Sequence, residues 1–281
     1  MKKLLAMLLT AAVSVSLIAC GGSSAPASGS DSKEETQEEA APAEAAQDAV
    51  SEALADGKLV VGTNAEFPPF EYLGDNGDPD GFDMALIKAI GEKLGVEVEI
   101  QNMEFGSLIT SIGSKIDIAI AGMTITDERK NAVDFSEPYY DAVQFVILPA
   151  DSAIAAKEDL LGKTIGCQLG TTGEYLIDDI IAEDGATQKK SYNKAVDAVN
   201  DLLNGRLDCV IIDRNPAMVF QSNYPDQIKL SDGADFGFEA EQYAIAMPKG
   251  DTALVEQVNA ALAELKSDGT FDKLVEQYIE N

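Results

Sequence analysis

The sequence predicts an α/β fold in which short apolar strands alternate with amphipathic helices. Three observations support it: runs rich in Val and Ile recur along the chain, stretches with helical spacing separate them, and glycines end several of these stretches. Continuous apolar strands between helices are typical of parallel sheets covered on both faces. About 225 residues follow residue 56, which is generous for one such sheet and leaves room for two lobes.

The expected strands are short, apolar and rich in β-branched residues; they lie at 58–63, 96–100, 116–121, 144–148, 164–169, 209–212 and 243–247. Between the first two, a polar turn at 74–81 precedes a helix that begins at Asp83 and stops at Gly95. Helical spacing also predicts a helix around 108–112, one around 196–203, and two helices after the last strand, the first ended by Gly269.

Composition excludes several classes of function. With 20 Lys and Arg against 49 Asp and Glu, the net charge is −29, which repels phosphate backbones and excludes nucleic-acid binding. The chain has no histidine, so it can build neither a Ser-His-Asp nor a Cys-His nucleophile. The commonest zinc ligand is also missing, and three scattered cysteines do not replace it, so we expect neither a metal nor a cofactor.

The N-terminal residues predict export. Two lysines precede an apolar run from Leu4 to Ala19, which is too short for a stable membrane span and is typical of a secretory signal over residues 1–19. The sequence Leu17-Ile18-Ala19-Cys20 resembles a bacterial lipoprotein lipobox, which implies cleavage before Cys20 and acylation of its thiol. The alternative is an ordinary signal peptide in which Cys20 is incidental.

Residues 20–56 predict a disordered acidic tether. Nine acidic residues face one base, Lys33, and the segment holds no aromatic residue, so it cannot bury enough apolar area to offset its ordering entropy. A short helix from about Val50 is expected to begin the folded part.

Three motif matches favour ordinary structure over chemistry. Gly162-Lys163-Thr164 ends like a phosphate-binding loop, but Lys157 stands where that loop needs glycine. Residues 76–81 open like a calcium loop, yet Ile87 occupies the position of the bidentate glutamate, which favours a surface turn. Cys167 and Cys209 fall in expected core strands, where free buried thiols are favoured over a disulfide bridge.

Three stretches follow strands and carry polar groups suited to a ligand. In a parallel α/β sheet, ligands bind beyond the carboxyl ends of the strands. Arg129 follows the strand 116–121 and can grip a carboxylate in bidentate fashion, and the amides of 170–173 can face an anion. Asp213 ends another strand, where it can accept from an ammonium group. Together these groups fit the zwitterion of an α-amino acid; taken singly, Arg129 fits a surface ion pair and Asp213 a helix cap.

At these residues the sequence resembles a known family. Thr63–Glu71 (TNAEFPPFE), Gly81-Phe82-Asp83, Ala121–Arg129 (AGMTITDER) and Asp134-Phe135-Ser136 look like the polar amino-acid-binding proteins of ABC importers, the bacterial extracellular solute-binding proteins of family 3. Leu160–Lys163, Gly170-Thr171-Thr172, Asp213 and Tyr243–Gly250 continue the match in order. The resemblance covers about residues 57–281, and around 121–140 the glutamine-binding members are nearest.

The resemblance implies a two-lobed periplasmic-binding-protein fold: each lobe is a mostly parallel sheet flanked by helices, and two hinge strands join the lobes. Lobe 1 comprises 57–140 and 241–281, and lobe 2 comprises 141–240, with hinges near 139–143 and 238–242. The function it implies is capture of a free L-amino acid between the lobes and delivery to a permease and its ATPase. We expect an extracytoplasmic, lipid-anchored monomer that is not an enzyme.

The same resemblance assigns roles to residues. Arg129 clamps the ligand carboxylate with Thr124 and Thr172, while Asp213, the backbone of Gly122 and the Thr124 hydroxyl take the ammonium. Phe67 and Phe105 wall the side chain, unless they are simply core residues. The full expected site comprises Asn64, Phe67, Phe105, Ala121, Gly122, Thr124, Arg129, Gln168, Thr172 and Asp213.

Departures from the family pattern bear on the ligand. Binders of cationic amino acids carry Asp where Asn64 stands, so its loss argues against lysine, arginine or histidine as the best ligand. Glutamine binders carry Lys and His at the positions of Gln168 and Ile212, which argues against glutamine itself, and a neutral Gln168 leaves an acidic side chain without a counter-charge. We therefore predict a neutral polar amino acid. Two alternatives remain open: an enzyme of the cyclohexadienyl dehydratase type, with Glu66 or Glu71 as the acid, and a ligand-sensing subunit of a receptor.

Overall fold

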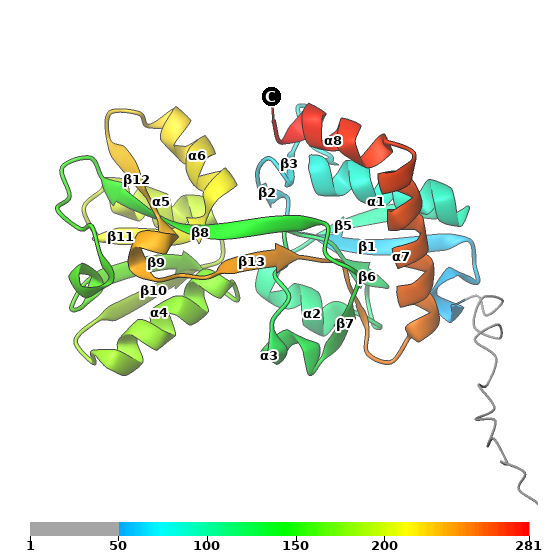
Figure 1. Ribbon diagram of the computed structural model, residues 1–281, viewed down its shortest axis with the longest axis horizontal. Helices are drawn as coiled ribbons and strands as arrows, with labels where there is room; N and C mark the ends of the chain where they lie inside the picture. The colour runs from blue at the N-terminus through cyan, green and yellow to red at the C-terminus, as the bar shows by residue number, and fades with distance from the viewer. Residues whose placement is uncertain (1–50, 281) are drawn as a thin grey trace, which may run out of the picture. The chain divides into compact units, whose positions relative to one another are not determined.

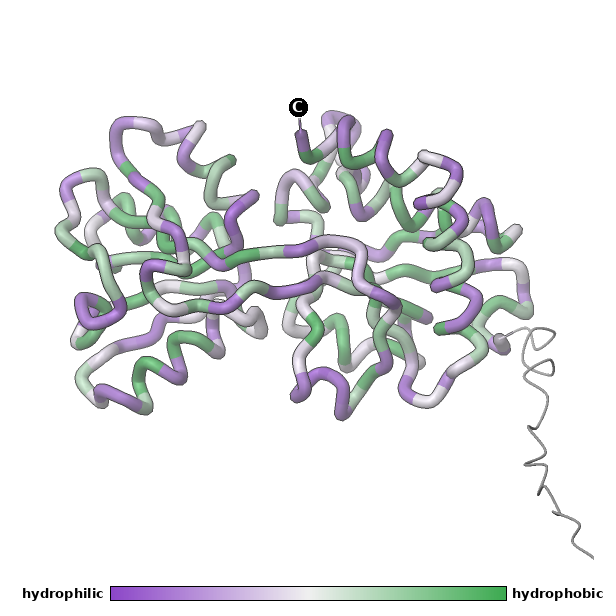
Figure 2. The backbone as a smooth tube through the Cα atoms, viewed as in Figure 1, coloured by the Kyte–Doolittle hydropathy of each residue, from purple (hydrophilic) through white to green (hydrophobic). Residues whose placement is uncertain are grey.

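The computed structural model describes residues 51–280, which form two α/β lobes (Figure 1). The predicted signal peptide, Cys20 and most of the predicted tether lie outside the described residues. Within residues 51–280, every helix is too short or too polar to cross a membrane. Hydrophobic residues concentrate in the strands of both sheets, whereas the helices alternate between hydrophobic and hydrophilic positions (Figure 2).

The first lobe is built on a five-stranded sheet. In spatial order its strands are β5 (Glu97–Asn102), β1 (Lys58–Thr63), β6 (Ile118–Ala119), β14 (Ala246–Pro248) and β7 (Val133–Phe135). Its helices are α1 (Phe82–Leu94), α2 (Leu108–Ser111), α3 (Asp127–Lys130), α7 (Thr252–Ser267) and α8 (Thr270–Tyr278), with 3-10 turns at η1 (Glu52–Leu54) and η2 (Phe105–Ser107). A small sheet of β2 (Glu66–Phe67), β3 (Glu71–Leu73) and β4 (Pro79–Asp80) completes this lobe.

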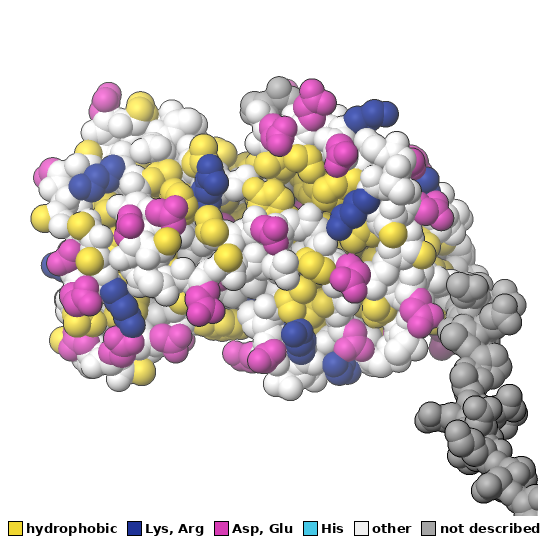
Figure 3. Space-filling view, in the orientation of Figure 1, with side chains coloured by type: hydrophobic (Ala, Val, Ile, Leu, Met, Phe, Trp, Pro, Cys, Tyr) yellow, Lys and Arg dark blue, Asp and Glu magenta, His cyan; other side chains and the backbone are white. Residues whose placement is uncertain are grey.

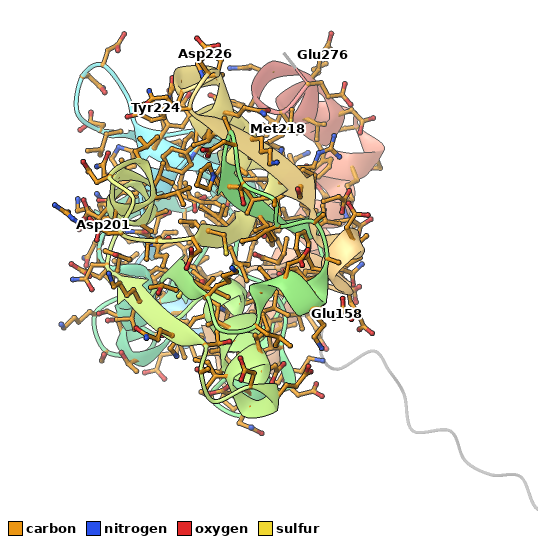
Figure 4. The ribbon with its side chains drawn as sticks, turned by 90° about the vertical axis from the view of Figure 1, so that its left-hand side faces the viewer. Glu158, Asp201, Met218, Tyr224, Asp226 and Glu276 are labelled. Carbon is orange, nitrogen blue, oxygen red and sulfur yellow. The ribbon has the colours of Figure 1, made fainter. Side chains whose placement is uncertain are left out.

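The second lobe has its own sheet. In spatial order the strands are β10 (Gln188–Tyr192), β9 (Thr164–Gln168), β11 (Cys209–Asp213), β8 (Tyr140–Pro149) and β12 (Ile228–Asp232). Its helices are α4 (Thr172–Glu183), α5 (Ala195–Leu203) and α6 (Arg214–Asn223), with 3-10 turns at η3 (Lys157–Leu160) and η4 (Gly233–Phe236). Figure 4 views this lobe from its outer end, where the Tyr192 hydroxyl donates to Asp201 on α5 at 2.7 Å.

Two antiparallel strands connect the lobes. Strand β8 runs from the first lobe into the second, and β13 (Ala240–Tyr243) runs back beside it (Figure 1). Their register pairs Tyr140 with Tyr243 and Val143 with Ala240. Each sheet is otherwise parallel and contains one reversed strand, β14 in the first and β8 in the second. The expected mostly parallel sheets are thus confirmed, while the lobe boundaries and the hinge motion remain predictions.

Helix α1 shows how glycines fix the element that supports the site. Leu86, Ile87 and Ile90 form its buried face, as the helical spacing predicts. Gly81 at its start has φ 120°, and a Cβ there would stand 2.3 Å from the Phe70 carbonyl oxygen, so only glycine fits. Gly95 ends the helix in the left-handed conformation.

Two expected strands differ from the structure. The run 116–121 contributes only Ile118–Ala119 to β6, because the chain leaves the sheet there to form the loop that carries Thr124. The run 243–247 is split: Tyr243 ends β13 beside β8, whereas Ala246 begins β14 between β6 and β7. The two intervening residues carry the chain from the connecting strands into the first sheet, a change of partner that apolar content does not reveal.

Two further expectations concern order and cysteine chemistry. The tether was expected to reach Asp56, but Ser51 and Leu54 are already buried and η1 packs onto the first lobe, in keeping with the short helix expected from about Val50. Cys167 and Cys209 are buried and free, as expected. Burial raises the pKa of the Cys167 thiol to about 12, which keeps it protonated and unreactive.

Candidate functional site

All ten residues of the expected site lie around one cavity between the two lobes. Those on elements of the first lobe follow β1 and β6 or lie on β2, η2 and α3; those on elements of the second lobe lie at the ends of β9 and β11 and at the start of α4. The lining residues are Asn64, Phe67, Phe105, Ala121, Gly122, Thr124, Arg129, Gln168, Thr171, Thr172 and Asp213. Thr171 is the one residue of this lining outside the expected set, although it belongs to the stretch Gly170-Thr171-Thr172.

Arg129 is a buried cation whose position is fixed by its own short helix. The Thr126 hydroxyl caps α3 by accepting from the Arg129 amide at 3.1 Å, and the side chain is only 4% exposed. Nη1 donates to the Thr124 carbonyl at 2.6 Å, and Nη2 donates to the Gly170 carbonyl of the second lobe at 2.9 Å. Its guanidinium carbon also stands 5.5 Å from the centre of the Phe105 ring.

The charge of Arg129 is not neutralised by an ion pair with a residue in the range 51–280. Burial lowers the pKa of Arg129 from its usual value, while Tyr175 and Glu241 act in the opposite direction. The guanidinium nevertheless stays charged, because its ordinary pKa lies far above neutrality. Arg129 is therefore not the surface ion pair of the alternative interpretation; it presents a buried positive charge to the cavity.

Asp213 supplies the opposite charge. It ends β11 at the N-cap position of α6, but its side chain makes no capping hydrogen bond, which argues against a purely structural cap. Oδ1 accepts from the Tyr243 hydroxyl at 2.6 Å, and the residue is 7% exposed. Burial, followed by the charge of Glu241, raises the pKa of Asp213 to about 7. A cation placed beside this carboxylate would reverse that shift.

The end of the cavity formed by Asn64 and Gln168 is polar and uncharged. Gln168 Nε2 donates to Asn64 Oδ1 at 2.8 Å and to the Asn193 carbonyl at 3.1 Å, and Asn64 Nδ2 donates to the Met103 carbonyl at 2.9 Å. These bonds fix both amides, one from each lobe. Phe67 and Phe105 both line the cavity, so neither is simply a core residue.

Glu241 is a polar residue at the site that sequence analysis missed. It lies on β13, opposite Ala142 of β8, and Oε2 accepts from the hydroxyls of Thr124 at 2.7 Å and Thr172 at 2.9 Å. The sequence gives only a glutamate near an expected hinge. Its approach to the two threonines depends on the register of the connecting strands, which no local pattern encodes.

A buried carboxyl pair lies behind the site. Glu71 and Asp83 are fully buried, and the charge of Asp83 acts on Glu71; Asp83 Oδ2 accepts from the Gly122 amide and the Tyr139 hydroxyl, both at 2.8 Å. Burial raises the pKa of Asp83 to about 6 and that of Glu71 well above its usual value.

This pair bears on the enzymatic alternative. The pair does not place an acid in the cavity: Glu71 is not among the lining residues, and Asp83 supports the Gly122 loop instead. Glu66, the other candidate acid, forms an ion pair with Lys194 of the second lobe. Within residues 51–280, no group of three acidic or cysteine side chains could hold a metal ion.

The surface of the described residues is rich in acidic side chains, which are spread over both lobes in Figure 3. Lys and Arg side chains are fewer on the same face. Such a surface field attracts cations and repels anions over roughly a Debye length, about 8 Å at physiological ionic strength. The positive charge of Arg129 therefore acts inside the cavity rather than through the outer surface.

Two lobes, two connecting strands and one shared cavity with opposite charges define a two-lobed solute-binding protein. Residues 59–281 match the bacterial extracellular solute-binding proteins, family 3. The arginine-binding extracellular protein ArtP of Bacillus subtilis (strain 168) is 37% identical over 281 residues, covering 99% of this chain and 98% of that protein. The ABC transporter arginine-binding protein 1 of Escherichia coli (strain K12) is 36% identical over 226 residues, covering 79% and 90%.

The solved structures that resemble this chain also include arginine-binding proteins. An ancestral arginine-binding protein is 41% identical and has a TM-score of 0.75 in its arginine-bound structure, which covers 79% of this chain and 98% of that one. The same comparison with an ancestral arginine-binding protein bound to glutamine gives 41% identity and a TM-score of 0.74, covering 80% and 99%. The chain belongs to the bacterial extracellular solute-binding proteins, family 3.

The family confirms three expectations from the sequence. The resemblance and the two-lobed fold are correct, and the family and these relatives are binding proteins rather than enzymes, as is this chain. An extracellular family also implies the extracytoplasmic location that was predicted.

Proposed function

We propose that this protein captures a free L-amino acid in the cavity between its lobes. The observation that supports this most is the pair of buried, opposite charges of Arg129 and Asp213, which line one cavity from different lobes and hydrogen-bond to neutral partners. Arg129 takes the ligand carboxylate, and Asp213 takes the α-ammonium with the backbone of Gly122. Leaving two such charges buried and unpaired is costly unless a ligand completes them.

The side chain of the ligand is proposed to be neutral and polar. The end of the cavity between Asn64 and Gln168 offers amide groups and no formal charge, so a carboxylate or ammonium buried there would lack a counter-charge. Glutamine fits this description, since an amide can exchange hydrogen bonds with both side chains.

Arginine is the second candidate. The relatives are named as arginine-binding proteins, and an ancestral arginine-binding protein has been solved with arginine and with glutamine. A guanidinium spreads its charge over a flat group that packs on aromatic rings, and Phe67 and Phe105 line this cavity. The net charge of −29 also favours the approach of a cation.

Delivery to a membrane transporter completes the proposal. A ligand that touches both lobes binds the closed arrangement better than the open one and drives closure about the β8 and β13 pair. The closed protein then docks, as a monomer, on an ABC permease with its ATPase. Signal cleavage before Cys20, acylation of its thiol and the acidic tether of residues 20–50 keep the lobes near the membrane.

The first experiment identifies what the purified protein carries. Mass spectrometry of the small molecules released by denaturation should detect a free amino acid, and thermal-shift screening should show stabilisation by the same compound. A neutral polar amino acid or arginine supports the proposal. Release of phenylpyruvate from added prephenate would instead favour the dehydratase alternative.

A further inference from the structure

The side chain of Glu241 links two cavity residues from outside the cavity. Thr124 and Thr172 line the cavity, whereas Glu241 lines a second groove that the same two threonines also border. A single oxygen of Glu241, Oε2, accepts hydrogen bonds from the Thr124 and Thr172 hydroxyls at 2.7 and 2.9 Å. Gln144 Nε2, on β8, approaches that oxygen at 3.3 Å and the Thr172 hydroxyl oxygen at 3.2 Å.

These contacts decide where the hydroxyl protons go. A carboxylate only accepts hydrogen bonds, and a hydroxyl has one proton to donate. Once Thr124 and Thr172 donate to Glu241, neither has a proton left for a ligand carboxylate. Thr124 keeps two lone pairs free, and Thr172 keeps one because Gln144 occupies the other.

We propose that Glu241 is a positioning residue that turns the Thr124 and Thr172 hydroxyls into hydrogen-bond acceptors toward the cavity, so that this wall recognises an ammonium group. The inference rests on the proposed function and refines it, because Thr124 and Thr172 then serve the ammonium and not the carboxylate. The carboxylate is left to Arg129 and to backbone amides at the start of α4.

The neighbouring residues fit this assignment. Asp213 is a further acceptor that lines the same cavity, and the charge of Glu241 contributes to the raised pKa of Asp213. A wall of carboxylate and hydroxyl acceptors satisfies the three N–H donors of an ammonium group. A hydroxyl or keto group in its place offers one donor or none and leaves buried acceptors unpaired, which a site of this kind rejects strongly.

The test compares ligands that differ only at the α-position. L-glutamine and L-arginine are each titrated by calorimetry beside the matching α-hydroxy acid, which for arginine is argininic acid. The proteins are the unmodified chain, Glu241→Gln, and Glu239→Gln as the control. Glu239 is an exposed carboxylate two residues away on the same segment, so its variant makes the same change in net charge.

For Glu241→Gln we expect the affinity for the amino acid to fall about tenfold, or about 1.4 kcal/mol, while that for the α-hydroxy acid stays within about threefold. A carboxamide can donate to the threonine oxygens and thereby free their protons for the cavity. Glu239→Gln should match the unmodified chain. An unchanged ratio of the two affinities would overturn the inference. If both affinities fell equally, Glu241 would be only a structural tie between the lobes.

A second route keeps the test informative if Glu241→Gln folds poorly, which its melting curve reports. Thr124→Val removes one hydroxyl with little change in shape and should shrink the same ratio of affinities. The double variant should add little beyond Glu241→Gln alone, because Glu241→Gln already breaks the Thr124–Glu241 hydrogen bond. A fully additive double variant would contradict the inference. If the unmodified chain binds neither, the amino acid released from the purified protein and its α-hydroxy acid replace them in the same comparison; failure to bind any amino acid would instead contradict the proposed function.

Discussion

At the scale of single residues, two buried charges define this protein. Arg129 and Asp213 are each nearly inaccessible to water, and each is held by neutral partners, namely backbone carbonyls for Arg129 and the Tyr243 hydroxyl for Asp213. Unpaired buried charges destabilise a fold, so their presence in one cavity points to a ligand that pairs them.

Arg129→Ala should therefore lose most of its affinity for the amino acid. Removing one side of a buried, hydrogen-bonded charge pair costs about 3 kcal/mol, or roughly a hundredfold in Kd. Titration calorimetry measures the loss. Arg206→Ala is the matched control, since Arg206 pairs with Asp201 on the surface; similar affinities for the two variants would remove Arg129 from the site.

The pKa of Asp213 predicts a pH-dependent affinity. Asp213 titrates at about 7 without ligand, and an ammonium group binds its ionised form. Between pH 8 and pH 6 the affinity should therefore weaken about tenfold, and binding near neutrality should release a proton. Calorimetry in buffers of different ionisation enthalpy counts that proton. Constant affinity from pH 5.5 to 8 would show that Asp213 does not bind the ammonium.

The raised pKa of Asp213 also affects the stability of the unliganded protein, in the opposite direction to its effect on ligand affinity. The folded pKa of Asp213 lies above its ordinary value of 3.8, and that of Asp83 is raised to about 6. The folded state therefore binds more protons than the unfolded state in this window, so these groups stabilise the fold at pH 5 and lose that contribution as pH rises toward 7.

Asn64 is the residue at which the selectivity for the side chain of the ligand can be altered. Asn64→Asp places a carboxylate beside Gln168 at the uncharged end of the cavity. It should shift selectivity toward lysine and arginine over glutamine by about tenfold or more, because a buried cation then gains a counter-charge. Competitive titration measures this ratio, with the exposed Asn204→Asp as control. An unchanged ratio would mean that Asn64 does not face the ligand side chain.

At the scale of elements, strand and helix patterns predicted the buried apolar elements best. β1, β9, β11, α1 and α5 lie within one or two residues of their expected limits, because each is a short apolar or amphipathic run with a clear glycine or turn at its end. Other elements, such as β10, β12 and α6, were not expected from the sequence. Among the expected strands, β6 shrinks to two residues, and the last one divides into β13 and β14, where the chain changes partners.

Substitution of Gly81 tests the close approach of the start of α1 to the backbone of Phe70. Gly81→Ala should destabilise the fold by about 3 kcal/mol, since its Cβ would overlap the backbone of Phe70 and its φ of 120° is strained for any L side chain. Gly77→Ala is the control: φ is 83°, but no atom lies within 4 Å of the added Cβ, so only the strain of about 1 kcal/mol applies. Urea unfolding compares them, and equal losses would contradict the close approach.

At the scale of the whole molecule, function depends on contacts between lobes that lie far apart in the sequence. Gln168 bonds to Asn64, Arg129 bonds to Gly170, and Lys194 pairs with Glu66, each across the cavity or its rim. The expected cavity residues could be found because they lie in recognisable motifs after strands. Glu241 and the Glu71–Asp83 pair could not, because their roles arise only when separate segments meet.

These contacts predict that the ligand compacts the protein. Small-angle X-ray scattering should give a smaller radius of gyration with saturating amino acid than without, because the ligand stabilises the arrangement in which both lobes touch it. The chain outside residues 51–280 is the same in both samples. Arg129→Ala should show no change with the same ligand; equal compaction of the variant would separate closure from carboxylate binding.

The most direct measurement is titration calorimetry of the protein, freed of bound ligand by unfolding and refolding, with each of the twenty L-amino acids. We expect one-to-one binding of at least one neutral polar amino acid or arginine, with a Kd in the micromolar range or tighter, about 8 kcal/mol or more. Heat-silent titrations that also leave the melting temperature unmoved for all twenty would contradict an amino-acid zwitterion bridging Arg129 and Asp213.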